Sequence, residues 1–268
     1  MNKYICLLVL SIISSLSACA GKPLSDQPES GILWVDSAAE YDALTLQTYQ
    51  NATRVLDDLI FDKTWTALPG QTGVEEKPAA IILDVDETAL SNVEFQLQLE
   101  GSFSHEAFDA WQNSNPAGRM PGAPEFIQAA RDKDVTMFFI TNRPCKELDF
   151  TPGPCPQEAI TLSDLSEAGI ETDSDHLMLV GEKPEWTREK RIRQELVAET
   201  HRVIMLIGDD LGDFLPCVRA KPVAPCAPAT AEYRTRMTIE HQQYWGLGWH
   251  ILPNPMHGSW TSFIASER

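Results

Sequence analysis

Short apolar runs divide the chain, and each of them ends at polar residues. They lie at 79–83 (AAIIL), 135–140 (VTMFFI), 177–180 (LMLV) and 203–207 (VIMLI). A continuous apolar run of this length is typical of a strand buried on both faces of a parallel sheet. We therefore predict four buried parallel strands.

Helical spacing of apolar residues appears before and between these runs. From Asp36 to Phe61, apolar residues recur at roughly helical spacing behind Asp36 or Ser37 as the candidate cap, which predicts one long amphipathic helix. Further helix candidates are residues 124–133, 156–168 and 186–199. Strands that alternate with helices predict an α/β fold with a doubly wound parallel sheet, preceded by an N-terminal helical segment.

A long insertion, about residues 91–121, separates the first two predicted strands. It carries the aromatic residues Phe95, Phe103, Phe108 and Trp111. We predict a small helical cap over the carboxyl ends of the strands, where ligands bind in such sheets. Phe95 and Trp111 are candidates for stacking on a substrate ring, which is worth about 1 to 3 kcal/mol per base. Alternatively, both rings only fill the core of the cap.

Polar residues follow every predicted strand. The segments are DVDET from Asp84, TNR from Thr141, GEK from Gly181 with Lys190 beyond it, and GDDLGD from Gly208. An Asp pair after a strand is weak evidence alone, because Asp commonly makes turns through its own side chain. Polar strand ends that converge on one edge instead indicate an active site.

Longer motifs carry a resemblance to a known family. They are ILW from Ile32 with SAAEYDAL, DVDETAL, FDAWQ, MPGAPEF, TNR, GDDLGDF and ILPNPMHGSW. With them the chain resembles the class C acid phosphatases, a lipoprotein-rich branch of the haloacid dehalogenase superfamily. The resemblance covers almost all of the chain that would remain after removal of a signal peptide, with residues 36–268 as the phosphatase domain, and implies a magnesium-dependent acid phosphatase. It also implies a homodimer as a candidate assembly.

The acidic residues suit the reaction that this resemblance implies. Asp84 can attack phosphorus as a carboxylate nucleophile and form a phospho-aspartyl intermediate. Asp86 is the candidate general acid, a role that calls for a raised pKa. Oxygen ligands from Asp84 and Asp209, with the main-chain carbonyl of Asp86 as in similar enzymes, suit Mg²⁺. Asp213 is a candidate to hold a metal-bound water.

The basic and polar residues fall into phosphate-binding roles. Thr141 and Asn142 resemble the phosphate-binding motif of the family, although residues of this kind also cap helices. Arg143 is either a phosphate ligand or a structural cation, and we rank it below Thr141. Lys183 and Lys190 compete for the catalytic lysine, and Lys190 is favoured because TREKRIR, from Thr187, fits the family pattern.

Departures from the family pattern affect the substrate pocket. Asp210 stands where the family usually has Asn, while Phe95 and His257 stand where Tyr is frequent. We nevertheless expect Phe95, Trp111 and His257 to contact the substrate. The departures leave the preference for nucleotides open.

The N-terminus has the pattern of an exported lipoprotein. Residues 1–18 read as a signal peptide, too short in its apolar run to span a membrane. LSAC, ending at Cys19, resembles the bacterial lipobox, so Cys19 is the expected lipidation site and residues 19–35 a tether. An ordinary cleavage near Ala18 or Ala20 is the alternative. Ala20 resembles the outer-membrane sorting residue, which predicts a water-soluble domain anchored in the bacterial envelope.

The net charge and the cysteines bear on binding partners and on disulfide bonds. A formal net charge of −18 argues against binding to polymeric nucleic acid, which relies on clustered Lys and Arg. Four cysteines, Cys145, Cys155, Cys217 and Cys226, are disulfide candidates in an oxidising compartment. Three connectivities are possible, and we favour the two local pairs, Cys145 with Cys155 and Cys217 with Cys226. A metal–thiolate site is the weaker alternative, because no CxxC spacing occurs.

The leading hypothesis is therefore hydrolysis of small phosphate monoesters, nucleoside 5'-monophosphates among them. A surface lipoprotein that binds ligands without catalysis is the first alternative, and its best support is the substituted pocket. A phosphotransferase that uses an alcohol in place of water is the second. Retention of nucleophile, acid, hydroxyl, lysine and metal acids favours the enzyme over the binding protein.

Overall fold

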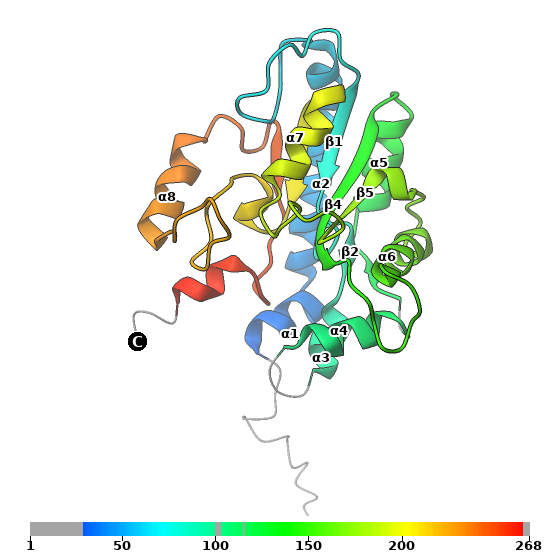
Figure 1. The fold of residues 1–268 in the computed structure, drawn as a ribbon. Coiled ribbons are helices and arrows are strands. Elements are labelled where there is room, and N and C mark those ends of the chain that lie inside the picture. The colour runs from blue at the N-terminus through cyan, green and yellow to red at the C-terminus, as the bar shows by residue number, and fades with distance from the viewer. Residues whose placement is uncertain (1–28, 100–102, 115, 265–268) are drawn as a thin grey trace, which may run out of the picture.

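The computed structural model describes residues 29–99, 103–114 and 116–264. At its centre is a sheet with strand order β5-β4-β1-β6-β7, in which all neighbours are parallel (Figure 1). The strands are β1 (Ala79–Leu83), β4 (Thr136–Pro144), β5 (Leu177–Val180), β6 (Arg202–Gly208) and β7 (Trp249–Ile251). The predicted α/β fold is confirmed, and β7 adds a fifth strand that the apolar pattern did not reveal.

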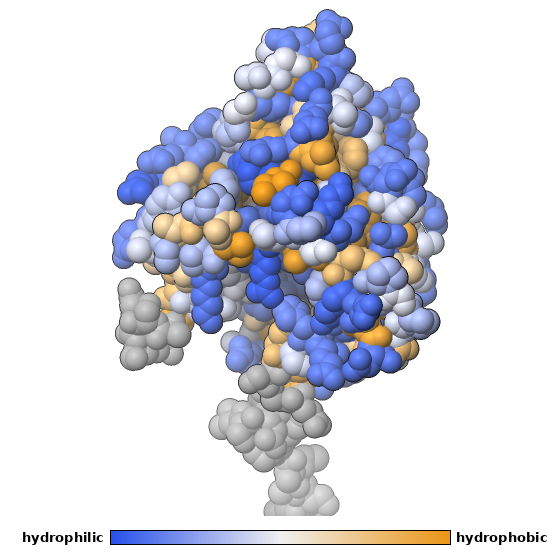
Figure 2. All heavy atoms as spheres, viewed as in Figure 1, coloured by the Kyte–Doolittle hydropathy of each residue, from blue (hydrophilic) through white to orange (hydrophobic). Residues whose placement is uncertain are grey.

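Helices cover both faces of this sheet. Alternate residues of β1 face opposite sides, so Ile81 and Leu83 join one buried cluster while Ala80 and Ile82 join another. The first cluster contains α2 (Ala39–Phe61), α5 (Ala123–Arg131) and α6 (Pro156–Glu167), and the second contains α7 (Arg191–Thr200). The peripheral helix α8 (Ala231–Glu240) has no buried residue. Figure 2 shows a largely hydrophilic surface broken by small apolar patches, as expected for this acidic chain.

The N-terminal region differs from its prediction. Instead of one helix from Asp36, there are two, α1 (Ser30–Ser37) and α2, separated by the extended residue Ala38. Neither predicted cap is used, because Ala38 is the N-cap of α2 and the Ser37 hydroxyl donates to the carbonyl of Leu33 at 2.6 Å. Helix α1 also shortens the predicted tether, since it begins at Ser30 and buries Val35.

Residues 1–28 lie outside the described residues, and with them the predicted signal peptide and Cys19. Within the described part of the chain, no helix combines the length and the hydropathy that a membrane crossing requires.

The insertion after β1 forms a small subdomain. Its two ends pair as antiparallel strands, β2 (Leu90–Ser91) and β3 (Gly118–Arg119). Between them lie α3 (Val93–Gln98) and α4 (His105–Gln112), the latter begun by Ser104, whose hydroxyl accepts the Ala107 N–H at 3.1 Å. Helix α3 contacts α1, so the N-terminal helix and the cap form one structure near the carboxyl ends of the strands (Figure 1).

The last predicted helix begins later than expected, at Arg191 and not at Trp186. The preceding loop is stabilised by its own bonds, because Gly181 donates to the carbonyl of Trp186 and the N–H of Glu189 donates to the Thr187 hydroxyl. This irregular loop places Lys190 at the N-cap of α7.

Candidate active site

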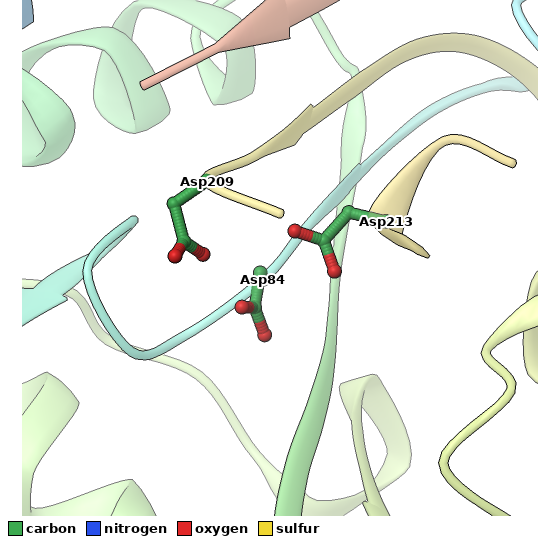
Figure 3. A group of neighbouring side chains, drawn as sticks. All are labelled: Asp84, Asp209 and Asp213. Atoms are coloured by element: carbon green, nitrogen blue, oxygen red, sulfur yellow. The ribbon is translucent and has the colours of Figure 1, made fainter. Parts of the chain in front are cut away.

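Three carboxylates meet at the carboxyl edge of the sheet. Asp84 follows β1, Asp209 follows β6, and Asp213 ends the short 3-10 helix η3 (Leu211–Asp213). One oxygen from each lies within 4.8 Å of the others, and Figure 3 shows the three side chains facing one another. They meet because β1 and β6 are parallel neighbours whose carboxyl ends reach the same edge.

Lys190 lies against this acid cluster. Its Nζ atom is 2.6 Å from Oδ1 of Asp84 and 2.7 Å from Oδ1 of Asp213, and its side chain is 3% exposed. Lys183, the competing candidate, lies over the ring of Trp186 at 4.4 Å from the centroid. Of the two lysines, the structure therefore brings Lys190 to the nucleophile candidate.

Burial governs the ionisation of the acid cluster. Loss of solvation raises the pKa of Asp84 to about 7, although the charge of Lys190 opposes this. Burial, followed by the charges of Asp213 and Asp84, raises the pKa of Asp209 well above its usual range. A cation bound beside these carboxylates would lower their raised pKa values, because its charge favours the ionised form. Three hard oxygen donors at this spacing fit a divalent cation.

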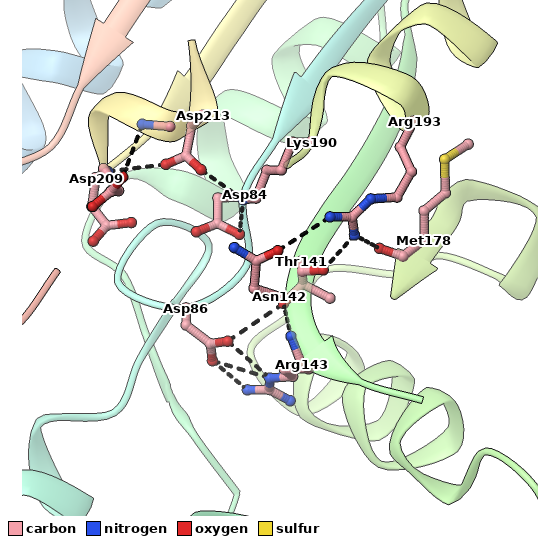
Figure 4. A network of polar contacts seen from close by, with 12 residues as sticks. Asp84, Asp86, Thr141, Asn142, Arg143, Met178, Lys190, Arg193, Asp209 and Asp213 are labelled. Carbon is pink, nitrogen blue, oxygen red and sulfur yellow. Dashed lines mark hydrogen bonds and ion pairs between the residues drawn. The ribbon is translucent and has the colours of Figure 1, made fainter. Parts of the chain in front are cut away.

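Asp86 points to a different cation. The guanidinium of Arg143 donates from Nε to Oδ1 of Asp86 at 3.0 Å and from Nη2 to the same oxygen at 2.8 Å (Figure 4). Its Nη1 donates to Oδ2 of Asp164 at 2.7 Å. The Arg143 residue is 2% exposed. Because it contacts both Asp86 and Asp164, it joins the DVDET loop to α6. These contacts fit the alternative that Arg143 is a structural cation.

The expected raised pKa of Asp86 is wrong for the protein without substrate. Burial alone would raise the pKa, but the charge and hydrogen bonds of Arg143, together with a bond from Asn92, lower it below its usual value. The prediction followed from the role proposed for Asp86 and did not include a contact with this arginine. The buried guanidinium and its hydrogen bonds thus outweigh the cost of burying the Asp86 carboxylate.

The two phosphate-binding candidates are fixed by arginines. The Thr141 hydroxyl accepts the main-chain N–H of Arg143 at 3.1 Å, and Oδ1 of Asn142 accepts from Nη2 of Arg193 at 3.1 Å. Arg193 is fully buried and also donates to the carbonyls of Thr141 and Met178 (Figure 4). Arg193 was not assigned a role from sequence, although it ends the TREKRIR segment that pointed to Lys190.

A comparison with known families decides what this site belongs to. Residues 31–260 match the HAD superfamily, subfamily IIIB (acid phosphatase). The chain is a member of this acid phosphatase family. It is therefore a phosphomonoesterase, as the motifs predicted.

Solved structures agree with this assignment. The phosphatase is similar to the class C acid phosphatase from Bacillus anthracis, with 27% identity, a TM-score of 0.72, and coverage of 91% of this chain and 90% of that chain. A second structure of a Bacillus anthracis class C acid phosphatase, with tungstate bound, is 26% identical, with a TM-score of 0.71 and 91% coverage of each chain.

Two further residues of this phosphatase meet beside the acid cluster. Nε2 of His257 lies 2.9 Å from Oε2 of Glu87, a side chain that is 1% exposed. Burial would lower the pKa of His257, but the Glu87 carboxylate raises it above its usual value. Glu87 has a φ of +55°, and its Oε1 accepts the N–H of Asn92 at 2.9 Å. Sequence reasoning missed Glu87, and its position within DVDET was the available signal.

The aromatic candidates form the core of the cap. Phe95 is 4% and Trp111 is 8% exposed, and the ring of Phe95 packs against Phe108 at 4.9 Å and Trp111 at 5.6 Å between centroids. Phe103, at 49% exposed, offers more free ring surface. The observed packing suits the core-filling alternative, and stacking of Phe95 or Trp111 on a substrate stays a prediction.

Asp210, the departure in the GDDLGD motif, is not one of the three clustered carboxylates, and its side chain bonds to η3 and to the C-terminal segment. Its Oδ1 accepts from the N–H of Gly212 at 2.8 Å and from the hydroxyl of Ser259 at 2.9 Å. It thereby caps η3 and anchors the C-terminal segment.

The four candidate cysteines form two disulfides, both between cysteines that are near in sequence. Cys145 pairs with Cys155 and Cys217 pairs with Cys226, at Cα distances of 4.7 and 5.0 Å.

Proposed function

We propose that this phosphatase hydrolyses phosphate monoesters through an aspartyl-phosphate on Asp84. The contact of Lys190 with Asp84 carries the proposal, because a buried cation beside a carboxylate both orients it and favours its ionised form. A carboxylate oxygen bonds to phosphorus while the bond from phosphorus to the leaving oxygen breaks. The leaving oxygen keeps the electron pair and takes a proton from Asp86. Water then attacks phosphorus, loses a proton to Asp86, and frees Asp84 and inorganic phosphate.

Asp86 must gain its proton when the substrate binds. Its pKa is low in the free protein because Arg143 pairs with it. The negative charge of a phosphoryl group placed beside Asp86 raises that pKa, since like charges disfavour ionisation. In the proposed mechanism, substrate binding therefore prepares the acid.

Asp84, Asp209 and Asp213, with the main-chain carbonyl of Asp86, are the residues that we propose hold Mg²⁺. The ion would supply positive charge to the phosphoryl oxygens and to the buried acids. Thr141 and Asn142 would hold the phosphoryl group from the end of β4. Tungstate is a tetrahedral oxyanion, so its presence in the Bacillus anthracis structure supports an oxyanion site in this fold.

We extend the proposal to substrates and location. Nucleoside 5'-monophosphates are proposed substrates because the cap offers aromatic surface at Phe103, and the half-exposed His257 lies beside the acid cluster. The lipobox pattern supports anchoring through Cys19 to the outer membrane, with the catalytic domain in water and nucleosides released for uptake.

The test is hydrolysis of p-nitrophenyl phosphate and nucleoside 5'-monophosphates between about pH 5 and pH 7, with Mg²⁺ or EDTA. We expect turnover that requires Mg²⁺ and is lost in Asp84→Asn. Acid-quenched samples of the wild type should contain protein-bound phosphate. Turnover that persists in Asp84→Asn, or in EDTA, would contradict the assignment of the nucleophile or of the metal.

A further inference from the structure

A turn near the C-terminus reaches the acid cluster from outside the strand ends that carry it. Nδ2 of Asn254 donates to Oδ2 of Asp209 at 2.7 Å. The Oδ1 atom of the same amide accepts the main-chain N–H groups of Met256 at 3.0 Å and His257 at 3.2 Å. Because these two donors identify the amide oxygen, the amide N–H must be the group that faces Asp209.

The turn that carries Asn254 is held on several sides. Trp260 donates from Nε1 to the carbonyls of Asn254 at 3.1 Å and His257 at 3.0 Å. Gly31 of α1 packs against it so closely that a Cβ atom there would lie 2.4 Å from the carbonyl oxygen of Pro255. Asn254 is thus a fixed donor, whose position is set by α1 and by the C-terminal segment together.

We propose that Asn254 is a positioning residue that holds the Asp209 carboxylate in the orientation needed to bind a divalent cation. The inference rests on the proposed metal site. Asp209 lies close to Asp84 and Asp213, and like charges repel. The bond from Asn254 to Oδ2 restrains the Asp209 carboxylate against rotating away from them. Removal of such a supporting hydrogen bond typically lowers metal affinity about 10- to 100-fold.

The change Asn254→Ser tests this role. A serine hydroxyl can still accept from the N–H groups of the turn, but it is too short to replace the amide contact with Asp209. Asn51→Ser is the matched control, since the Asn51 amide donates to the carbonyl of Gly246 and contacts none of the three acids. Magnesium binding to the full-length, metal-free protein is measured by titration calorimetry, and Tm is measured with and without Mg²⁺.

We expect Asn254→Ser to bind Mg²⁺ about 10- to 100-fold more weakly than wild type. The metal-free Tm should stay near that of wild type, and kcat should largely recover at saturating Mg²⁺. Asn51→Ser should bind Mg²⁺ as wild type does. A second variant, Asn254→Ala, should show the same loss of affinity together with a lower metal-free Tm, because it also removes the acceptor of the turn.

Two results would overturn the inference, and they differ in scope. If wild type binds Mg²⁺ and Asn254→Ser binds it equally tightly, the positioning role is wrong while the proposed metal site stands. If wild type binds no Mg²⁺ in the calorimeter and gains no Tm from it, both the positioning role and the proposed use of magnesium are wrong.

Discussion

The ammonium group of Lys190 lies 2.6 Å from the Asp84 carboxylate, and it is shared with Asp213. All three side chains are largely buried, so little water screens the charge of the lysine. Removal of one member of a buried ion pair leaves an uncompensated charge, at a cost of about 3 to 5 kcal/mol. Lys190 therefore supports the folded state as well as the proposed chemistry.

The change Lys190→Met should lower kcat by about 10²- to 10³-fold, because it removes a preorganised cation from the phosphoryl-transfer site. Steady-state kinetics at saturating Mg²⁺ measures this. The matched control is Lys183→Met, which removes a cation that lies over Trp186 and touches none of the acids. Equal losses in the two variants would contradict the assignment of Lys190.

Arg143→Gln should destabilise the fold by about 3 to 5 kcal/mol, because Asp86 and Asp164 would lose their buried partner. Urea unfolding at neutral pH measures the loss. Arg119→Gln is the control: Arg119 pairs with Glu125 at the surface, and exposed pairs contribute about 0 to 1 kcal/mol. A loss below about 1 kcal/mol in Arg143→Gln would show that the buried network contributes little.

Acid should destabilise the fold through His250. Burial lowers the pKa of this histidine to about 4, from an ordinary value near 6.5. Between those values the unfolded chain binds the proton and the folded chain does not. The free energy of unfolding should therefore fall as the pH drops from about 6.5 to about 4, by up to about 3 kcal/mol from this residue.

His250→Gln removes this titration while it retains a polar side chain. Urea unfolding at several pH values should show a shallower loss of stability in the variant than in wild type across that window. His241, which is exposed to a greater degree, offers the control His241→Gln. The same pH slope in wild type and His250→Gln would rule out His250 as the source.

Gly208→Ala should disrupt the acid cluster. A Cβ atom at Gly208 would lie 2.2 Å from Oδ2 and 2.5 Å from Cβ of Asp213, so Asp213 and its loop must move. We expect a loss of at least about 10-fold in Mg²⁺ affinity, measured by calorimetry. Gly118→Ala should bind Mg²⁺ normally, since its new Cβ would meet nothing closer than 3.5 Å. Unchanged affinity in Gly208→Ala would mean that Asp213 is not needed for the metal.

The parts of the fold that follow from local patterns were predictable. β1 and β5 span the same residues as their apolar runs, because a strand buried on both faces needs an unbroken apolar segment. The short strand β7 (WHI) escaped notice, since its burial comes from neighbours that are remote in sequence. Helix α1 was missed because residues 19–35 were interpreted as a tether, although α1 begins at Ser30 and buries Val35.

Some residues of the candidate site were predictable from the sequence, and others were not. Strand ends predicted the meeting of Asp84 and Asp209, because parallel strands present their carboxyl ends at one edge. Lys190 was predicted from the resemblance of the TREKRIR segment to the family pattern, since it lies beyond the end of β5 at the N-cap of α7. Arg143 was ranked too low because its reach to both Asp86 and Asp164 depends on packing against α6. Asn254 lies 45 positions beyond its partner Asp209, and no spacing rule connects them.

The paired strands β2 and β3 bring the two ends of the cap side by side, at Leu90 and Arg119. The peptide between them can therefore lengthen, shorten or change in sequence while the chain still leaves and re-enters the core at the same place. Asp84, Asp86, Asp209 and Asp213 lie outside this loop of chain. Such a stem lets the cap vary without displacing the residues that we propose for catalysis.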